Sequence, residues 1–132
     1  MAKKNYTAQN KAKVRLGQLI SDLRQEKNIS LRNFADSIGL SPSNLSYIEN
    51  GTNIPTPEVY KRIIAELKPA TKRHQKMDRL YSDLRNLPPP DVCEIILRNP
   101  ALCEKLRLLE NTELTQIHIN ALEGLFSSFK AN

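Results

Sequence analysis

The sequence predicts an all-α protein, and three observations lead to this prediction. The chain has 132 residues but only 4 Gly, which leaves few positions for the hairpin turns of a β-sheet protein. Apolar residues recur at spacings of three and four, whereas strict apolar alternation over five or more residues is absent. Most of the 8 Pro stand where a helix would begin. This length suits one ordinary domain or two very small helical ones.

The first predicted helix runs from about Asn10 to Lys27. Its apolar residues lie at positions i, i+3, i+4 and i+7, which is the stripe of an amphipathic helix. They are Leu16, Leu19, Ile20 and Leu23. Residues 1–9 show no such periodicity and carry Lys3 and Lys4, so we expect a flexible basic arm there.

Two short helices are predicted between residues 30 and 51. Ser30 is a suitable N-cap for the first, and Gly39 ends it because glycine adopts the left-handed conformation at little cost. Ser41 and Pro42 then supply a cap and a first-turn proline for the second helix. The inward faces of the pair are Leu31, Phe34, Ala35, Ile38, Leu45 and Ile48.

Five more helical segments follow. They cover approximately residues 56–67, 70–87, 91–98, 100–110 and 116–130. Pro88, Pro89 and Pro90 end the second of these segments, since proline cannot continue a helix. We place a domain boundary near residue 68. Residues 10–68 should then fold as one helical domain, and residues 69–132 as a second.

Positive charge is concentrated in the first part of the chain. Residues 1–79 contain 15 basic and 7 acidic side chains, a net charge of +8, whereas residues 80–132 contain 5 and 7, a net charge of −2. A basic segment beside a slightly acidic one suggests that the first binds a polyanion and the second binds protein.

The segment SLRNFADSIGLSPSNLSYIENG, residues 30–51, has the pattern of a helix-turn-helix. Ala35 lies four residues before Gly39, and its small side chain allows the two helices to approach closely and cross steeply. The flanking helices would supply the apolar surfaces that such a pair cannot cover alone.

This pattern resembles the Cro and CI repressor type of helix-turn-helix, the XRE family. The resemblance covers about residues 14–67 and includes LGQLISDLR, FADSIGLSPSNLSYIENG and the helix from Pro57 to Leu67. It departs from the family pattern at Leu31, where the family often has Gln, and at Pro42, an early recognition-helix position. The resemblance implies an N-terminal Cro/CI-like domain of four to five helices that binds double-stranded DNA, followed here by a small C-terminal helical domain.

The residues expected to contact DNA lie on the second helix of the pair and close to it. If Leu45 and Ile48 face inward, helical rotation places other residues of this recognition helix on its outer and N-terminal surface. They are Ser43, Asn44, Ser46 and Tyr47. We also assign Ser41, Pro42 and Arg32 to this surface. Lys11 and Lys13 stand at the start of the first helix, where the helix dipole disfavours cations, and are expected to bind phosphate.

Two further features follow from the resemblance. Asn50, Thr52 and Asn53 resemble the family's loop in which side chains and amides hold phosphates of the DNA backbone. Arg24 and Glu49 match positions that form an ion pair between the first helix and the recognition helix.

Other functions have little support in the sequence. His74 and His118 are isolated from any set of residues with metal-ligand spacing, and no nucleophile motif or glycine-rich phosphate loop is present, so we predict no enzyme, metal site or cofactor. No apolar run reaches the length of a membrane span, which predicts a cytoplasmic protein without a membrane partner. Cys93 and Cys103 are expected to be small buried apolar residues rather than a disulfide.

The sequence therefore predicts a transcriptional regulator, in the first instance a repressor, that binds operator DNA as a homodimer. Self-association is assigned to residues 69–132, whose apolar side chains include Cys93, Ile96, Leu106, Leu109, Phe126 and Phe129. The alternative is an antitoxin or a phage-encoded inhibitor, in which the C-terminal domain captures a protein partner and DNA binding is autoregulatory.

Overall fold

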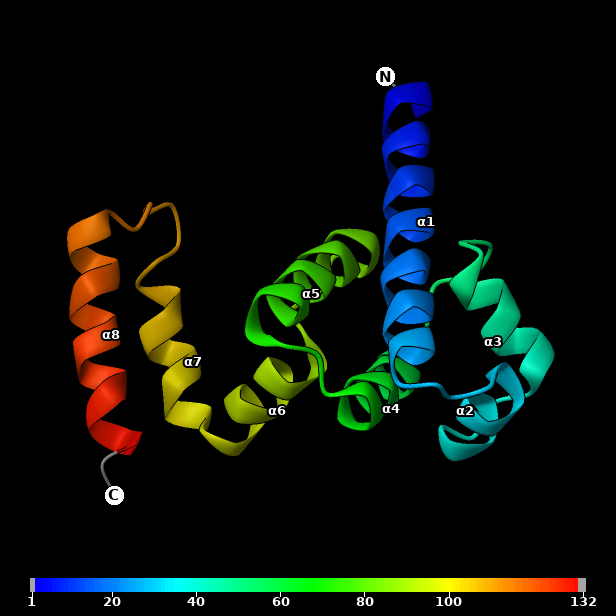
Figure 1. Cartoon of the computed structure of the whole chain (residues 1–132). Helices are drawn as coiled ribbons and strands as arrows, with labels where there is room; N and C mark the ends of the chain where they lie inside the picture. Colours follow the sequence, from blue (N-terminus) through cyan, green and yellow to red (C-terminus); the bar gives the residue numbers. More distant parts are fainter. Residues whose placement is uncertain (1, 131–132) are drawn as a thin grey trace. The chain divides into compact units, whose positions relative to one another are not determined.

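The computed structural model describes the backbone of residues 2–130 and the side chains of residues 8–129. Within this part it has eight α-helices and no β-strand (Figure 1), which confirms the predicted all-α fold. The helices are α1 (Ala2–Glu26), α2 (Leu31–Ser37), α3 (Pro42–Glu49), α4 (Pro57–Leu67), α5 (Thr71–Arg85), α6 (Pro90–Arg98), α7 (Pro100–Arg107) and α8 (Gln116–Lys130).

Side-chain caps determine where three of the helices begin. The hydroxyl oxygens of Ser30, Ser41 and Thr56 each accept a hydrogen bond from the backbone amide three residues later. Pro42 and Pro57 follow two of these caps and stand in the first turn, where a missing amide proton costs no helical hydrogen bond. These starts were predictable because the capping residues act locally.

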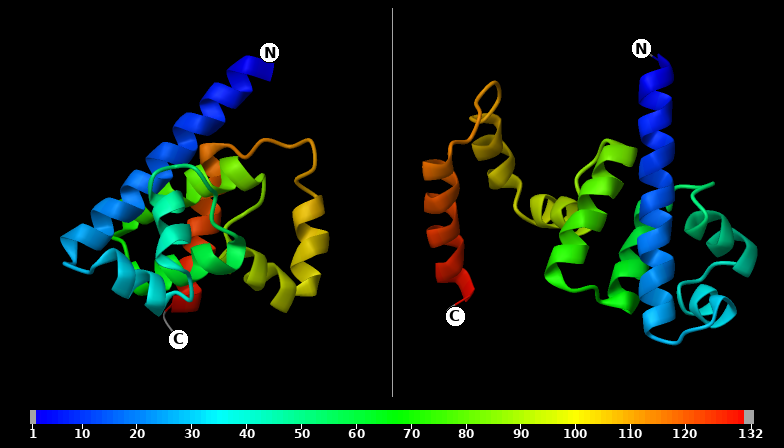
Figure 2. Two further views of the ribbon diagram at one scale, coloured as in Figure 1. Left: turned by 90° about the vertical axis from the view of Figure 1, so that its right-hand side faces the viewer. Right: turned by 45° about the horizontal axis from the view of Figure 1, so that its top comes forward.

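Helix α1 begins eight residues earlier than predicted. Residues 2–9, which we expected to form a flexible arm, are helical and extend α1 beyond the neighbouring helices (Figures 1 and 2). The segment is rich in Ala, Lys and Gln and contains neither Gly nor Pro, so it continues a helix that later turns nucleate. Ala8 and Ala12 also line a cavity together with Leu84 of α5. The absence of an apolar stripe was therefore a poor indicator of disorder.

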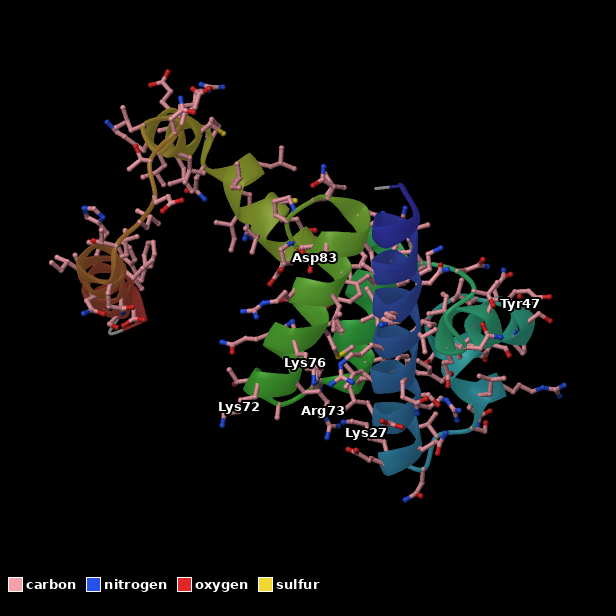
Figure 3. All side chains as sticks on the ribbon, turned by 90° about the horizontal axis from the view of Figure 1, so that it is seen from above. Lys27, Tyr47, Lys72, Arg73, Lys76 and Asp83 are labelled. Atoms are coloured by element: carbon pink, nitrogen blue, oxygen red, sulfur yellow. The ribbon has the colours of Figure 1, made fainter. Side chains whose placement is uncertain are left out.

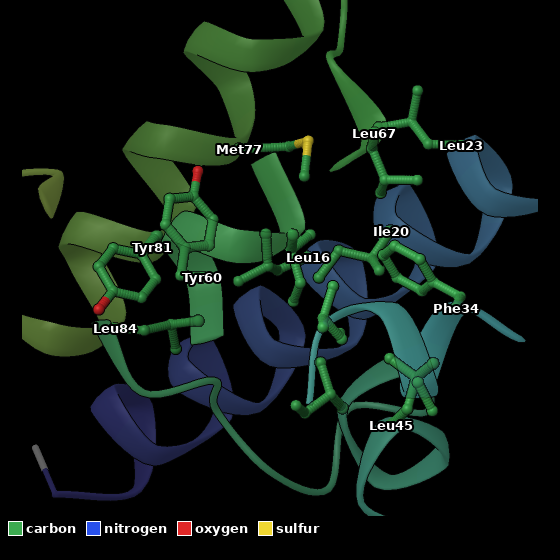
Figure 4. Close-up of a cluster of buried hydrophobic side chains, with 14 residues drawn as sticks. Leu16, Ile20, Leu23, Phe34, Leu45, Tyr60, Leu67, Met77, Tyr81 and Leu84 are labelled. Atoms are coloured by element: carbon green, nitrogen blue, oxygen red, sulfur yellow. The ribbon is translucent and has the colours of Figure 1, made fainter. Parts of the chain in front are cut away.

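The first five helices share one apolar core. Its fourteen buried side chains include Leu16 and Ile20 of α1, which lies between α3 and α5 (Figures 1 and 4). Helix α5 contributes Met77, Tyr81 and Leu84, each at most 8% exposed. The first compact unit includes α5 and ends at Glu94, whereas the sequence led us to expect a boundary near residue 68.

Tyr60 of α4 and Tyr81 of α5 stack in this core, with ring centroids 4.1 Å apart. The hydroxyl of Tyr60 donates a hydrogen bond of 2.6 Å to Oδ1 of Asp78, whose other oxygen lies 3.4 Å from Nε2 of His74. Burial is the main cause that raises the pKa of Tyr60, and the hydrogen bond to Asp78 raises it further. The aromatic contact joins α5 to α4, and α5 also packs extensively against α1, so α5 belongs to the first unit.

The second compact unit, residues 95–132, has no buried core in its described part. No side chain from Ile95 to Phe129 is buried, and ten large apolar residues are at least 36% exposed. Cys93 and Cys103, predicted to be buried, are half-buried free thiols. None of the described helices is both long enough and apolar enough to cross a membrane.

Candidate nucleic-acid interface

Helices α2 and α3 are joined by a tight turn. Gly39 has a φ of +73°, a conformation that favours glycine, and the amide of Leu40 donates a hydrogen bond of 2.8 Å to the carbonyl oxygen of Ala35. Ala35 is fully buried between the helices. The small residue and the glycine therefore have the roles that their spacing predicted.

The orientation of α3 leaves one face open to solvent. Leu45 and Ile48 are 0% and 6% exposed and anchor the helix to the core. Tyr47 is 47% exposed and lies on the side of α3 away from α1 (Figure 3). Ser43 and Asn44 are exposed at the N-terminal end, whereas Ser46 is half-buried. This face can present hydroxyl and amide groups to base edges and an aromatic ring to a thymine methyl group.

Two predicted contact residues also have local structural roles. Oγ of Ser41 accepts the cap hydrogen bond from the amide of Asn44, and Pro42 occupies the first turn of α3. Pro42 lines an open groove together with Arg32 and Asn33 of α2. Arg32, which we predicted to contact DNA, thus lies next to the N-terminus of α3.

The loop after α3 has a defined internal structure. Oδ1 of Asn50 accepts hydrogen bonds from the amide and the hydroxyl of Thr52, at 3.0 and 2.6 Å. The amides of Thr52 and Asn53 also donate to the carbonyl oxygen of Tyr47. These two amides are thus already hydrogen-bonded at the end of α3. The exposed side chains of Thr52 and Asn53 are the groups that remain available.

The ion pair implied by the family resemblance is present. Nε and Nη2 of Arg24 donate to the Glu49 carboxylate at 3.0 to 3.1 Å, and the side chains are only 13% and 8% exposed. Nη1 of Arg24 also donates to the carbonyl oxygen of Ile29 at 2.8 Å. The pair thus fixes the C-terminal end of α3 to α1 and to the loop before α2.

Gly17 is a structural residue that our sequence reasoning missed. A Cβ atom at this position would lie 2.4 Å from the carbonyl oxygen of Ile48 and 2.6 Å from that of Glu49. Gly51 is similarly close to Val14, and its φ is +83°. A glycine inside a helix lowers helix stability, so its presence in α1 was an available signal of close backbone contact.

The predicted phosphate-binding lysines lie on α1 near the loop after α3. Lys11 is exposed and Lys13 is half-buried, and both stand within one turn of Val14, which contacts Gly51. Other cations lie elsewhere. Lys72, Arg73 and Lys76 of α5 are on the opposite side of α1 from Tyr47 (Figure 3). The positive charge of the first part of the chain therefore lies on α5 as well as near the exposed face of α3.

Comparison with known proteins agrees with this geometry. Residues 20–68 match the helix-turn-helix family. Over 49 residues the chain is 41% identical to the ImmF control region 10 kDa protein of Bacillus phage phi105. That match covers 37% of this chain and 54% of the length of the phage protein. No solved structure is significantly similar to the chain.

Residues 20–68 are therefore similar to helix-turn-helix domains, and α2 and α3 are the two helices of that motif. This similarity agrees with the resemblance to the Cro and CI type that the sequence motifs predicted.

Proposed function

We propose that this protein is a transcriptional regulator that binds operator DNA as a homodimer and represses transcription. The observation that carries the proposal is helix α3, whose polar and aromatic face is exposed because Leu45 and Ile48 bury the opposite face in the core. The similarity to a phage control-region protein supports a regulatory role for the DNA-binding domain.

In this proposal, base recognition depends on the N-terminal and outer residues of α3. The side chains of Ser43 and Asn44 donate and accept hydrogen bonds at base edges in the major groove. Tyr47 packs on a thymine methyl group or donates to a phosphate. Ser46 is half-buried, so it contributes less contact area than its exposed neighbours.

Phosphate contacts on both sides of α3 fix the orientation of the domain on DNA. Arg32 lies beside the N-terminus of α3. Lys11 and Lys13 lie on α1, near the C-terminus of α3. The side chains of Asn50, Thr52 and Asn53 border the same end of α3. Such contacts supply affinity without reading the sequence.

Within residues 69–132, to which the sequence analysis assigned self-association, we place it in residues 95–132, because α5 belongs to the first unit. These residues include four basic and four acidic side chains and are neutral, whereas the first 94 residues carry the whole formal charge of +6. Two copies of the basic unit repel each other, but two neutral units with exposed apolar faces do not. Helices of 8 and 15 residues are marginal alone, so burial against a second copy would stabilise them.

The test combines a nuclease protection footprint on DNA upstream of the gene with sedimentation of the purified protein. We expect protection of two half-sites separated by about one helical turn, about 34 Å, and a dimer at tens of micromolar. If no protection occurs even at low salt, the regulator proposal fails.

A second candidate is a protein-capturing antitoxin or inhibitor that binds DNA only for autoregulation. The exposed Phe126 and Phe129 of α8, with ring centroids 6.3 Å apart, would suit a foreign protein surface as well as a second copy. A monomeric full-length chain that still binds DNA would favour this candidate.

A further inference from the structure

The last turn of α5 contacts the loop that follows the recognition helix. Nε of Arg85 donates to the carbonyl oxygen of Pro55 at 3.1 Å, and Nη2 donates to the carbonyl oxygens of Pro55 and Ile54 at 2.7 and 3.1 Å. Arg85 lies thirty residues further along the chain and outside the matched family segment, which ends at residue 68. This contact therefore joins the DNA-binding motif to a helix that the motif does not include.

These carbonyl groups depend on Arg85 for their hydrogen bonds. Among the described residues, no backbone amide outside the regular helical pattern donates to the carbonyl oxygen of Ile54 or Pro55. Pro55 is buried and Ile54 is half-buried, so these acceptors are only partly available to water. A buried carbonyl without a donor is destabilising. The planar guanidinium satisfies both carbonyls at once, which a lysine ammonium does less well.

Arg85 is attached to the core through its helix. It follows the buried Leu84 directly and the buried Tyr81 by one turn of α5, and Tyr81 stacks on Tyr60 of α4. Arg85 itself is half-buried. A side chain whose helix is packed into the core provides a rigid anchor for the loop.

The loop is therefore fixed at both ends. At its start, the amides of Thr52 and Asn53 donate to the carbonyl oxygen of Tyr47, in the last turns of α3. At its end, Arg85 holds Ile54 and Pro55. The second anchor thus directly follows Thr52 and Asn53, whose exposed side chains are those to which the proposed function assigns phosphate contacts.

We propose that Arg85 is a positioning residue of the DNA interface, which holds the loop so that Thr52 and Asn53 meet the phosphate backbone. This inference rests on the proposed function and adds to it that DNA affinity depends on α5. Arg85 contacts no DNA itself. It acts through the two carbonyls that it binds.

The test uses the full-length chain with three variants, Arg85→Gln, Arg85→Lys and Arg79→Gln. Arg79 is exposed on the same helix, so Arg79→Gln removes the same charge without touching the loop and is the matched control. The probe is a fluorescent 30-base-pair duplex of random sequence, because phosphate contacts are made on any DNA. Binding is measured over a range of salt concentrations, well below the melting temperature of each variant.

We expect Arg85→Gln to bind about tenfold more weakly than Arg79→Gln, the effect of misplacing about one charge-assisted hydrogen bond. Its log–log salt slope should equal that of Arg79→Gln, because Thr52 and Asn53 are neutral and the loss of their contacts changes no counterion release. Arg85→Lys keeps the charge but loses the planar guanidinium that binds both carbonyl oxygens. This variant should therefore also bind more weakly than the wild type. In NMR spectra, the amide signals of Thr52 and Asn53 should shift in both Arg85 variants, whereas those of Phe34 and Ile63 should not.

Equal binding by Arg85→Gln and Arg79→Gln would overturn the inference while leaving the regulator proposal intact. A salt slope lower by about 0.9 in Arg85→Gln than in Arg79→Gln would also overturn it, because Arg85 would then bind a phosphate itself. Retention of wild-type affinity by Arg85→Lys would also overturn it, since charge alone would then be sufficient. If the wild-type chain binds neither this duplex nor its upstream DNA, the proposed function itself fails.

Discussion

The Arg24 guanidinium binds both carboxylate oxygens of Glu49 and joins the first helix to the end of the recognition helix. Removing one partner of so enclosed a pair leaves the other charge buried without compensation. Arg24→Met should therefore lower the free energy of unfolding by about 3 to 5 kcal/mol. Chemical denaturation followed by circular dichroism measures this loss.

Two further variants make the test specific to the pair. The double variant Arg24→Met/Glu49→Met should recover part of the stability, because no lone charge remains buried. Arg79→Met, on the exposed face of α5, should change stability by less than about 0.5 kcal/mol. A loss below 1 kcal/mol in Arg24→Met would mean that the pair is effectively solvated.

Gly17→Ala should disturb the contact between α1 and α3. The added methyl group would lie 2.4 Å from the carbonyl oxygen of Ile48, so the helices must separate. We expect a loss of about 1 to 3 kcal/mol in the free energy of unfolding and weaker DNA binding. Gly124→Ala is the control, since nothing lies within 4 Å of a Cβ atom there, and it should increase the helical signal slightly. Similar effects of the two substitutions would contradict the close contact at Gly17.

Asn44→Ala and Tyr47→Ala should reduce discrimination between the operator and random DNA. Both side chains are on the exposed face of α3, where base-edge contacts carry sequence information. Lys11→Ala should weaken binding to both duplexes about equally, because a phosphate contact is independent of sequence. Competition binding with the two duplexes distinguishes these outcomes. If Asn44→Ala and Tyr47→Ala lose equal affinity for both duplexes, Asn44 and Tyr47 do not recognise bases.

A chain that ends at Leu87 should fold as a monomer. It keeps all fourteen buried core residues and Arg85, and it lacks the exposed apolar helices assigned to self-association. A chain that ends at Lys68 loses the core side chains of Met77, Tyr81 and Leu84. At about 2 to 5 kcal/mol for each such loss, it should be unfolded. This differs from the sequence-based expectation that residues 10–68 fold alone.

Sedimentation and circular dichroism of the two fragments check this prediction. A dimeric fragment ending at Leu87 would place the association surface in the first unit. A folded fragment ending at Lys68 would show that α5 is dispensable for the core.

The stability of the protein should fall as the pH rises above about 10. Burial, and then the hydrogen bond to Asp78, raise the pKa of Tyr60 above that of a tyrosine in the unfolded chain. Its contribution is thus fully present below the unfolded pKa and is lost above it, at about 1.4 kcal/mol per pH unit. Tyr60→Phe should make this decline shallower than in the wild type by that amount. Denaturation between pH 9 and 11 measures the slopes, and identical slopes in the variant and the wild type would refute the prediction.

The sequence by itself determined the helical fold, the helix-turn-helix and most helix starts, because caps, glycine turns and apolar stripes act over a few residues. Ser30, Ser41, Gly39 and the stripe from Leu16 to Leu23 illustrate this, and family resemblance added the Arg24–Glu49 pair. Only the tertiary structure revealed that α5 completes the first unit, that Gly17 allows two helices to touch and that Arg85 reaches the loop after α3. These contacts join residues at least 18 positions apart in the chain. No local pattern specifies which partner each side chain meets. Packing decides that, because each helix buries its apolar face against whichever neighbour the connecting loops bring within reach.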